Sequence, residues 1–412
     1  MPSLRTLALV VALLVYPLSG LYSRLVVLGF LRSTPPARLS STSTPGILES
    51  FVLPDVKQAE DFAYHEPSGL IVLTAPGHPS GRYGWWPPIL HLDRPEDAQT
   101  TNGGIYILDP TTWKSRRLSI SGFTGPFIPH GLDIYSPKGL PDGFYLHAVN
   151  HKPASHGPHK ANSTVEIFRI SISDSSATHL QTVHHPLIVT PNDIYSLSAT
   201  EFLVTNDHVN REPGLLRTAE EVFTLQLTSR TTVVKVDASS GIKAEVVKKG
   251  IHSANGLAHG PGGEIALGSA AGGVLHILSP DLTTTSTVSF PSTLDNPTYL
   301  ADPYATPSSD LSGYVLAGLL QAHKLGEHSA DPESLAPGAI WLARKTAAGK
   351  WEKKLLLEDD GAWVNAATTA MLLPIDPKGT NGRREAWVVA VGFMARGISV
   401  ARVDLTEWAT RT

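Results

Sequence analysis

The segment TPNDIY, residues 190–195, lies shortly before a β-rich run, EFLVTND at 201–207. An adjacent Asn and Asp commonly bond their own backbone in a turn, and most such pairs do nothing else. Comparable short polar stretches, which we call polar-turn segments, precede other β-rich runs: AEDF (59–62), IPHGL (128–132), ANGLA (254–258), LDNPT (294–298) and VNAATT (364–369). The recurrence indicates six structural units rather than one isolated turn.

The stretches between polar-turn segments contain short β-rich runs such as GGIYILD (103–109), TTVVKVD (231–237) and EAWVVAVGF (385–393). Most runs are bounded by Gly, Pro, Asp or Ser, and no convincing amphipathic helix follows them, which is typical of an all-β protein. Polar-turn segments lie roughly 40 to 70 residues apart, a spacing suited to a four-stranded propeller blade. We therefore predict an all-β fold, a six-bladed β-propeller over residues 47–412, whose polar-turn segments lead into the innermost strands and converge on a central channel.

Composition excludes several classes of protein. With 412 residues, of which 42% are hydrophobic and 17% charged, the chain can bury a large core and is not disordered. A formal net charge of -4 gives no attraction toward phosphate backbones, so no nucleic-acid partner is expected. The absence of cysteine excludes thiol catalysis, zinc–thiolate sites and disulfides. The sequence also has no G-x-S-x-G and no H-E-x-x-H motif.

The polar-turn segments bring carboxylates and carboxamides toward one channel. Such groups either cap turns, or they surround a cation that relieves their mutual repulsion and poor solvation. The available ligands are all oxygen, which is the preference of Ca²⁺. Glu60, Asp61, Asp193 and Asp295 supply four negative charges, which match two Ca²⁺ ions. The pattern alone leaves turn capping and a metal-filled channel both open.

The N-terminal region predicts a compartment. An uncharged run from Thr6 to Ser23 and an apolar patch from Leu25 to Leu31 predict a signal peptide or signal anchor with an amphipathic segment over residues 1–32. Residues 33–46, STPPARLSSTSTPG, resemble a flexible stalk. The expected location is the secretory pathway, with the protein membrane-anchored, on the lumenal or extracellular side, or secreted. Asn162 in the sequon NST predicts glycosylation, although one sequon also arises by chance.

The wording and order of the segments AEDF, PHGL, AVNH, STVEIF, PNDIY, TNDH, ANG and LDN resemble the serum paraoxonase/arylesterase family. Members of that family are six-bladed propellers with two calcium ions in the central tunnel, and they hydrolyse lactones and aryl esters. The matching segments extend from residue 59 to 296, and their combination is specific although each segment alone is weak.

The resemblance implies roles for individual residues. Ligands of a catalytic calcium would be Glu60, Asn192, Asn255, Asp295 and Asn296. A second, structural calcium would be held by Asp61, Asp193 and the backbone carbonyl of Leu132. The two calcium ions are the cofactors, and the expected substrate is a small-molecule ester or lactone.

The resemblance also implies a catalytic pair of histidines. His130 and His151 match the family's dyad, in which one ring takes a proton from water and the other tunes or relays it. Asp207 and His208 match a pair that would orient His151. Calcium would polarise the ester carbonyl as a Lewis acid, so no nucleophilic Ser is required. The family's amphipathic N-terminal segment has a counterpart in residues 21–31, which predicts contact with a membrane or lipid surface.

Two features depart from the family. Its animal members tie the N-terminal strand to the last blade with a disulfide, which this chain cannot form, so we expect ILESFVL (47–53) to close the ring by pairing with GISVARVDL (397–405). An insertion at 81–97 carries Trp85 and Trp86, which either wall an apolar substrate pocket or pack against the side of the propeller.

Two alternative functions remain open from the sequence. The first is a propeller enzyme of different chemistry, similar to strictosidine synthase or gluconolactonase, against which the AVNH and TNDH matches count. The second is a calcium-stabilised propeller without enzymatic activity that binds a partner, because a fold does not determine a function.

Overall fold

The structure is a computed structural model that describes residues 20–32, 39–41, 46–78, 81–140, 142–157, 159–222, 231–346 and 348–410. Most of the predicted signal peptide or anchor, residues 1–19, lies outside these ranges. Among the residues described, no helix is long and apolar enough to cross a membrane.

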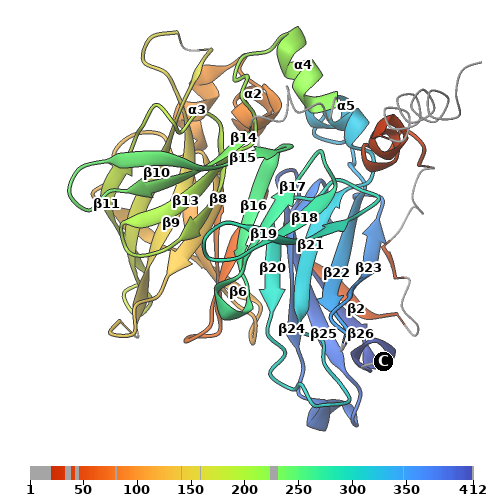
Figure 1. Ribbon diagram of the computed structural model, residues 1–412. Coiled ribbons are helices and arrows are strands. Elements are labelled where there is room, and N and C mark those ends of the chain that lie inside the picture. Colours follow the sequence, from red (N-terminus) through yellow and green to blue (C-terminus); the bar gives the residue numbers. More distant parts are fainter. Residues whose placement is uncertain are drawn as a thin grey trace, which may run out of the picture.

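Six sheets follow one another along the chain, each made of four or five strands (Figure 1). Blade 1 contains β3 (Phe62–His65), β4 (Leu70–Ala75), β5 (Gly104–Asp109) and β6 (Lys114–Arg117). Blade 2 contains β7 (Ser119–Ser121), β8 (Pro129–Tyr135), β9 (Gly143–Pro153), β10 (Ala161–Ser171) and β11 (Ser176–Val183). Blade 3 contains β12 (Pro191–Ser196), β13 (Glu201–Asn206), β14 (Thr231–Asp237) and β15 (Lys243–Ile251).

The second half of the chain repeats this arrangement. Blade 4 contains β16 (Ala254–His259), β17 (Ile265–Ser269), β18 (Val274–Leu278) and β19 (Thr284–Ser289). Blade 5 contains β20 (Pro297–Leu300), β21 (Gly313–Leu319), β22 (Gly338–Lys345), β23 (Trp351–Asp359) and β1 (Ser40–Ser41). Blade 6 contains β24 (Ala367–Pro374), β25 (Glu385–Gly392), β26 (Ile398–Asp404) and β2 (Ile47–Leu53). The predicted six-bladed β-propeller is confirmed.

Ring closure also follows the prediction. β2 pairs antiparallel with β26, with Phe51 opposite Val400 and Leu53 opposite Ile398. The N-terminal strand thus completes the last blade through backbone hydrogen bonds, without a disulfide. Closing the ring in this way joins the two ends of the described propeller in one sheet.

Each polar-turn segment ends at or within the first strand of its blade. These first strands are β3, β8, β12, β16, β20 and β24, and each lies at one edge of its sheet. The first strands contact one another from β3 to β8, β8 to β12, β12 to β16, β16 to β20 and β20 to β24. They therefore line one channel, and polar residues far apart in the sequence meet there.

The hydrophobic core is divided among the interfaces between neighbouring blades. Between blades 1 and 2, for example, Val72 and Ile105 pack with Phe144, Leu146 and Phe168, all of which are fully buried or nearly so. Alternate side chains of an inner strand face different neighbouring blades: Val72 packs against blade 2, whereas Ile71 and Leu73 pack against blade 6. Inner strands are therefore buried on both faces.

The helices and 3₁₀ turns of the propeller lie in the loops between strands, except for α6, which follows the last strand. They are α2 (Gly81–Gly84), η1 (Pro87–Ile89), α3 (Pro95–Thr101), α4 (Leu215–Val222), η2 (Pro261–Gly263), η3 (Ala322–Lys324), α5 (Leu325–Ala330), η4 (Pro377–Thr380) and α6 (Thr406–Ala409). Figure 1 shows α2, α3, α4 and α5 together at one end of the propeller. These helices cover the end of the channel that the polar-turn segments line.

The segment before the propeller is partly structured. Residues 20–27 form a helix whose Val27 is buried, and the Leu28 carbonyl accepts a backbone hydrogen bond from His323 in η3. Ser40 and Ser41 form β1, which pairs with β23 of blade 5. The predicted flexible stalk at 33–46 is therefore wrong for these two residues, because their backbone extends a sheet edge.

Asp133 connects three blades near the ends of the first strands, away from the polar-turn segments. Its Oδ2 accepts a hydrogen bond from the Ser196 N–H (2.6 Å) and lies 2.8 Å from His259 Nε2. Burial lowers the pKa of His259, but the charge and hydrogen bond of Asp133 outweigh burial and leave that pKa above its usual value. The pair therefore stabilises the fold mainly when the imidazole is protonated.

We predict a pH-dependent effect of replacing His259 by Gln. Because the folded-state pKa is raised, the stabilisation is complete below the unfolded value of about 6.5 and disappears as pH rises through the folded value. The variant should lose more melting temperature at pH 5.5 than at pH 9, by a small amount because 49% of the side chain is exposed. Thermal unfolding at both pH values measures this, with His156→Gln in an exposed loop as control. Equal losses at both pH values would contradict the role of the pair.

Candidate active site and metal centre

Five buried oxygen atoms in the channel have no hydrogen-bond partner among the described residues. They belong to Glu60 (Oε2), Asn192 (Oδ1), Asn255 (Oδ1), Asp295 (Oδ1) and Asn296 (Oδ1). The set coincides with the five residues predicted to bind the catalytic calcium. Leaving a single buried polar atom unpaired typically costs about 1–3 kcal/mol, so five at one place require an explanation. Two carboxylates and three carboxamide oxygens are a donor set that fits Ca²⁺.

Neighbouring residues fix the orientation of this donor set. The side-chain amide of Asn296 donates to Glu60 Oε1 (2.9 Å) and to Thr369 Oγ1 (3.0 Å). Because the nitrogen is engaged there, the Asn296 oxygen and the second Glu60 oxygen remain available to another ligand. Thr369 is the last residue of the sixth polar-turn segment, VNAATT. Its role could not be predicted from the sequence, because the Asn of that segment, and not the Thr, matches the pattern of the other segments.

The carboxylates near the unpaired oxygens repel one another. Burial and the charges of Asp295 and Asp61 raise the pKa of Glu60 well above its usual value. Burial and the charge of Asp61 likewise raise the pKa of Asp295. A cation among these carboxylates would reverse the repulsion. Across the parts of the chain that the structure describes, no three His, Cys, Asp or Glu side chains form a metal-binding group. This accords with the composition of the donor set, because three of its five members are carboxamides.

Unlike the five unpaired oxygens, the carboxylates predicted to bind the structural calcium accept backbone hydrogen bonds. Asp61 accepts backbone hydrogen bonds from Phe62 and Leu132 (2.8 and 2.9 Å). Asp193 accepts from Ile194 (2.7 Å) and from Leu257 (2.6 Å). Each carboxylate thereby ties its own blade to the next one. The Leu132 N–H donates to Asp61, whereas the atom predicted to bind calcium is the Leu132 carbonyl oxygen. Calcium binding by that oxygen stays a prediction.

The pKa values of this second pair are also displaced. Burial raises the pKa of Asp61 to about 7, against the opposing effect of its backbone hydrogen bonds. Burial and the charges of Asp61 and Glu60 raise the pKa of Asp193 well above its usual value. Two buried carboxylates that repel each other are consistent with the predicted cation, and their role in binding it stays a prediction.

The two predicted catalytic histidines contact each other. His130 Nδ1 lies 2.9 Å from His151 Nε2, and His151 Nδ1 lies 2.8 Å from Ser163 Oγ. The remaining nitrogen of His130, Nε2, lies 3.7 Å from Glu60 Oε1. The rings thus connect the donor set to Ser163 of β10. Ser163 pairs with His151 across the β9–β10 hairpin, a contact that follows from aligning AVNH with STVEIF.

Both histidines are neutral at physiological pH. Burial lowers the pKa of His151 to about 3, and burial and the neighbouring His151 hold the pKa of His130 well below its usual value. A neutral imidazole can accept a proton, whereas an imidazolium cannot. The dyad is therefore able to act as a base.

Asp207 and His208 were predicted to orient His151. The structure places the Asp207 carboxylate 2.9 Å from His208 Nδ1, whereas the side-chain hydrogen bonds of His151 go to His130 and Ser163. Burial would raise the pKa of Asp207, but the charges of His208 and Arg217 hold it well below its usual value. Asp207 thus acts on His151 through its negative charge, and Ser163 is the side chain that fixes the ring.

The inserted segment covers the dyad. The Trp85 indole N–H donates to the His151 carbonyl (2.7 Å), and the Trp86 ring lies 4.9 Å from the His130 ring, centroid to centroid. The Arg82 guanidinium stacks on Trp86 at 3.7 Å. Both tryptophans are buried against the dyad, and the pocket described below is lined by the neighbouring Pro87 and Pro88, so a substrate-pocket wall at Trp85 and Trp86 stays a prediction. Arg82 was missed from the sequence, because the loop conformation that brings it there has no short-range signal.

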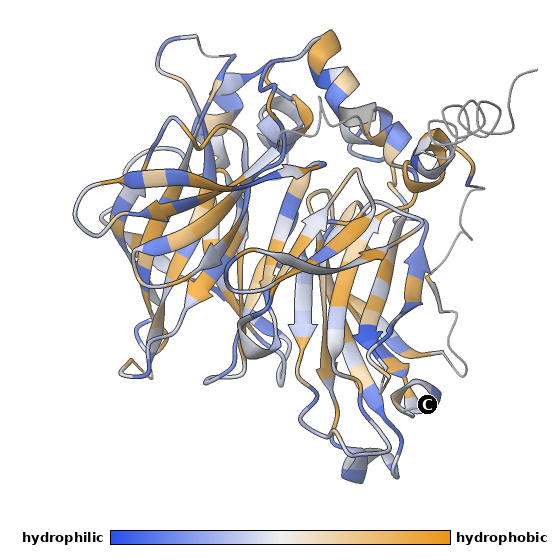
Figure 2. Cartoon of the chain, viewed as in Figure 1, coloured by the Kyte–Doolittle hydropathy of each residue, from blue (hydrophilic) through white to orange (hydrophobic). Residues whose placement is uncertain are grey.

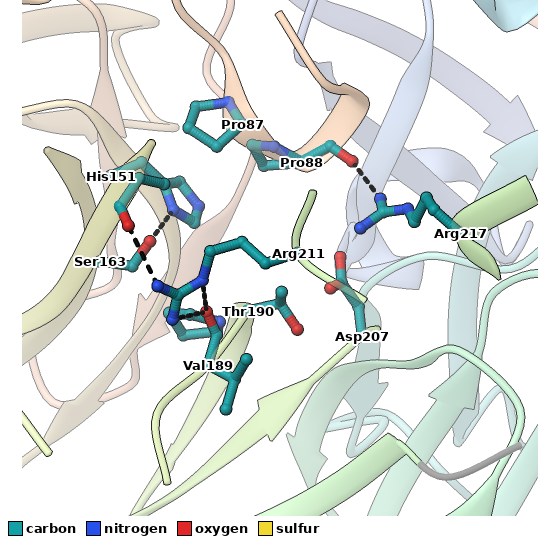
Figure 3. Close-up of a pocket in the computed structure, with 11 residues that line it drawn as sticks. Pro87, Pro88, His151, Ser163, Val189, Thr190, Asp207, Arg211 and Arg217 are labelled. Carbon is teal, nitrogen blue, oxygen red and sulfur yellow. Dashed lines mark hydrogen bonds between the residues drawn. The ribbon is translucent and has the colours of Figure 1, made fainter. Parts of the chain in front are cut away.

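A small, partly open pocket lies beside the dyad. Its lining consists of Pro87, Pro88, His151, Ala161, Ser163, Val189, Thr190, Pro191, Asp207, Arg211 and Arg217 (Figure 3). Asn162, the predicted glycosylation site, is half-buried between two lining residues on β10. Because successive strand side chains point to opposite faces, it faces away from this pocket. Its glycosylation stays a prediction.

The fold and the site together define a six-bladed propeller with an oxygen donor set and a histidine pair at one end of its channel. Residues 95–266 match the protein family described as Arylesterase. Serum paraoxonase/arylesterase 2 of Rattus norvegicus is 30% identical over 184 residues, which is 42% of this chain and 48% of that protein. Serum paraoxonase/lactonase 3 of Homo sapiens is 34% identical over 167 residues, which is 40% of this chain and 43% of that protein.

The predicted resemblance to the serum paraoxonase/arylesterase family is therefore confirmed. The match covers less than half the length of these curated relatives. Among solved structures, the PQQ-bound aldose sugar dehydrogenase of Streptomyces coelicolor has a TM-score of 0.48 at 12% identity, covering 90% of this chain and 99% of that chain. A likeness at this level carries no functional argument.

Proposed function

We propose that the chain is a calcium-dependent hydrolase of lactones and/or aryl esters. One observation carries this proposal: five unpaired buried oxygens lie beside a histidine dyad, with Glu60 belonging to the donor set and approaching His130 within 3.7 Å. The similarity to arylesterases over residues 95–266 supports the same chemistry.

The donor set would hold one calcium ion, and Asp61, Asp193 and the Leu132 carbonyl would hold a second. The catalytic calcium, when bound, would supply Lewis-acid polarisation of the substrate carbonyl and stabilise negative charge on its oxygen. Glu60 and Asp295 would neutralise the first ion, and Asp61 and Asp193 the second. The chain's own residues would carry out the proton transfers.

His130 is suited to be the general base. Its Nε2 faces Glu60, while its Nδ1 is engaged with His151 Nε2. With Nδ1 protonated, His130 donates to His151, and His151 in turn donates from its own Nδ1 to Ser163. This tautomer leaves the lone pair of His130 Nε2 free to take a proton from water. Glu60 and Asp207 would then stabilise the imidazolium through their charges.

The proposed reaction is a direct attack of water on the substrate and involves no covalent enzyme intermediate. Water gives one proton to His130 Nε2 as its oxygen bonds to the acyl carbon. The bond from the acyl carbon to the alkoxy or aryloxy oxygen then breaks, and the proton on His130 passes to that leaving oxygen. The products are a carboxylic acid and an alcohol or phenol, joined in one molecule when the substrate is a lactone.

A substrate panel separates this proposal from its alternatives. The full chain is assayed with phenyl acetate and several lactones, in the presence of calcium and after treatment with a chelator. Hydrolysis that stops on chelation and returns with calcium supports the proposal. Hydrolysis that chelation leaves unchanged removes the metal from the mechanism. If the calcium-loaded protein hydrolyses none of these substrates, the ester hydrolase proposal is wrong, and a binding propeller or another enzyme class becomes the better account.

We also propose that the protein enters the secretory pathway and contacts a lipid surface. The uncharged run from Thr6 to Ser23 supports the secretory pathway. The lipid contact is supported by exposed apolar side chains on the N-terminal helix, in the turn that follows it and on α4: Leu21, Tyr22, Phe30, Leu31, Leu215 and Leu216. Figure 2 shows apolar colouring on the N-terminal helix and at the outer end of α4. Burying apolar area contributes about 25 cal/mol per Å².

A vesicle assay tests the lipid contact. Replacing Phe30 and Leu31 by Ser removes two half-exposed apolar side chains and should lower cosedimentation with phosphatidylcholine vesicles several-fold. The double replacement of Thr111 and Thr112 by Ser, in the turn between β5 and β6, is the control. Equal binding by the wild-type chain and the Phe30 and Leu31 variant would contradict the lipid contact.

A further inference from the structure

The pocket beside His151 has apolar walls and a cationic group. Pro87, Pro88, Val189 and Pro191 supply the apolar walls, and Arg211 enters between them. Figure 3 shows the Arg211 guanidinium on the side of Ser163 and His151, with Asp207 and Arg217 across the pocket. Asp207 and Arg217 also line the pocket. Apolar walls combined with a few charged groups are typical of a site that binds a small molecule with a charged end.

The hydrogen bonds of Arg211 leave part of its guanidinium available. Nε and Nη2 donate to the Val189 carbonyl (3.0 and 2.7 Å), and Nη1 donates to the Ala161 carbonyl (3.2 Å). A guanidinium has five N–H groups, so two remain. Within the described part of the chain, no carboxylate lies within 4.0 Å of Arg211. The carbonyls hold the group in place but do not neutralise its charge.

Other charges near the dyad increase the positive potential. Burial is the main reason for the low pKa of His151; the charge of Asp207 opposes burial, and the charges of Arg82 and Arg211 lower the pKa further. Arg82 is buried, and its Nε and Nη1 have no hydrogen-bond partner among the described residues. Asp207 offsets part of this charge, but it interacts with His208 and Arg217 on the opposite side of the pocket. An anion beside Arg211 would therefore contact the guanidinium directly, with the Asp207 carboxylate across the pocket.

We propose that this pocket selects esters and lactones that carry a carboxylate. The apolar body of the substrate would lie against Pro87, Pro88 and Val189, and its carboxylate would bind Arg211, which places the ester group toward His151. This inference rests on the proposed hydrolase function, and it adds a substrate class to it. Arg211 is the specificity-determining residue, because guanidinium–carboxylate hydrogen bonds are strong and directional.

A matched substrate pair tests the selectivity. The calcium-loaded full chain is assayed with 4-acetoxybenzoate and with its neutral methyl ester, and each kcat/KM is divided by the rate of hydroxide-catalysed hydrolysis. The normalised ratio, anionic over neutral, should exceed one. Arg211→Gln should lower this ratio by about ten- to hundredfold, and Arg211→Lys, which keeps the charge, should lower it less. Arg116→Gln, an equal charge change at an exposed position, is the control and should leave the ratio unchanged.

A binding measurement makes the test independent of turnover. Calorimetry with benzoate and with the neutral benzamide should show tighter binding of benzoate to the wild-type chain and loss of that preference in Arg211→Gln. If the protein hydrolyses no ester but binds benzoate through Arg211, the hydrolase proposal fails and the anion site stands. If hydrolysis occurs but the anionic preference is absent, or is unchanged in Arg211→Gln and Arg211→Lys, the inference is overturned. Melting temperatures of both variants show whether Arg211 has only a structural role. A variant that melts at a lower temperature but keeps the wild-type ratio of anionic to neutral substrate also overturns the inference.

Discussion

Replacing Glu60 by Gln is expected to weaken calcium binding in the channel by about 100-fold or more, equivalent to about 2.7 kcal/mol. The change removes one of the two charges in the donor set and one of its unpaired oxygens. It also removes the carboxylate that approaches His130 within 3.7 Å, so ester hydrolysis should fall with metal affinity. Calorimetric titration of the metal-free protein with calcium measures the affinity directly.

Thermal unfolding distinguishes this explanation from simple damage to the fold. Because burial and neighbouring charges raise the pKa of Glu60, its ionised form destabilises the metal-free protein at neutral pH. The metal-free variant should therefore melt no lower than the metal-free wild-type chain. Calcium should raise the melting temperature of the wild type by more than that of the variant, because the variant keeps only the second site. Asp193→Asn is the comparison: it should lose the part of the calcium-dependent stability that the second site supplies, while the first site still binds calcium. A variant of Glu60 that binds calcium as tightly as the wild type would remove Glu60 from the donor set.

Replacing His130 by Gln should lower kcat for phenyl acetate by about 10²- to 10⁴-fold, the usual contribution of a general base. The remaining interactions of the donor set should persist, so calcium affinity should change little. The reason lies in the geometry: His130 Nε2 faces the donor set, and its Nδ1 connects to His151. Steady-state kinetics combined with calcium titration separates the loss of the base from the loss of the metal.

His147→Gln is a matched control for His130→Gln. His147 is also buried with a lowered pKa, of about 4, but it hydrogen-bonds Ser196 and the Ala199 carbonyl, away from the donor set. Its replacement should affect stability more than kcat, whereas the replacement of His130 should do the opposite. Full activity of His130→Gln with normal calcium binding would show that water is activated by another group.

The sequence was sufficient to predict the fold because every blade repeats the same short signals. Polar-turn segments and β-rich runs recur along the chain, so an error in one blade would not have changed the architecture. The closing pair β2 and β26 could be predicted because both ends of the chain carry strand-like runs. The strand formed by Ser40 and Ser41 could not be predicted from the sequence. Two serines do not favour a strand by themselves, and these two form one only by pairing with the edge of β23.

The part of the candidate site that could be predicted from the sequence is the part formed by the repeated polar-turn segments. The five residues of the donor set occupy polar-turn segments, and their meeting follows from the convergence of the first strands. Ser163 could be found only by aligning two strands across a hairpin, since no motif marks a serine opposite a histidine. Arg82 lies in the short helix α2 of the inserted segment, and Arg211 lies in a loop; long-range packing determines both conformations, and their positions required the structure.

A crystal structure of the full chain grown with millimolar calcium tests the central claim most directly. We expect an ion bound by the five channel oxygens, at about 2.3–2.6 Å from Glu60, Asn192, Asn255, Asp295 and Asn296. A second ion is expected near Asp61 and Asp193. Density that shows no ion at the first site, with the five oxygens bonded to water or to one another, would contradict the account.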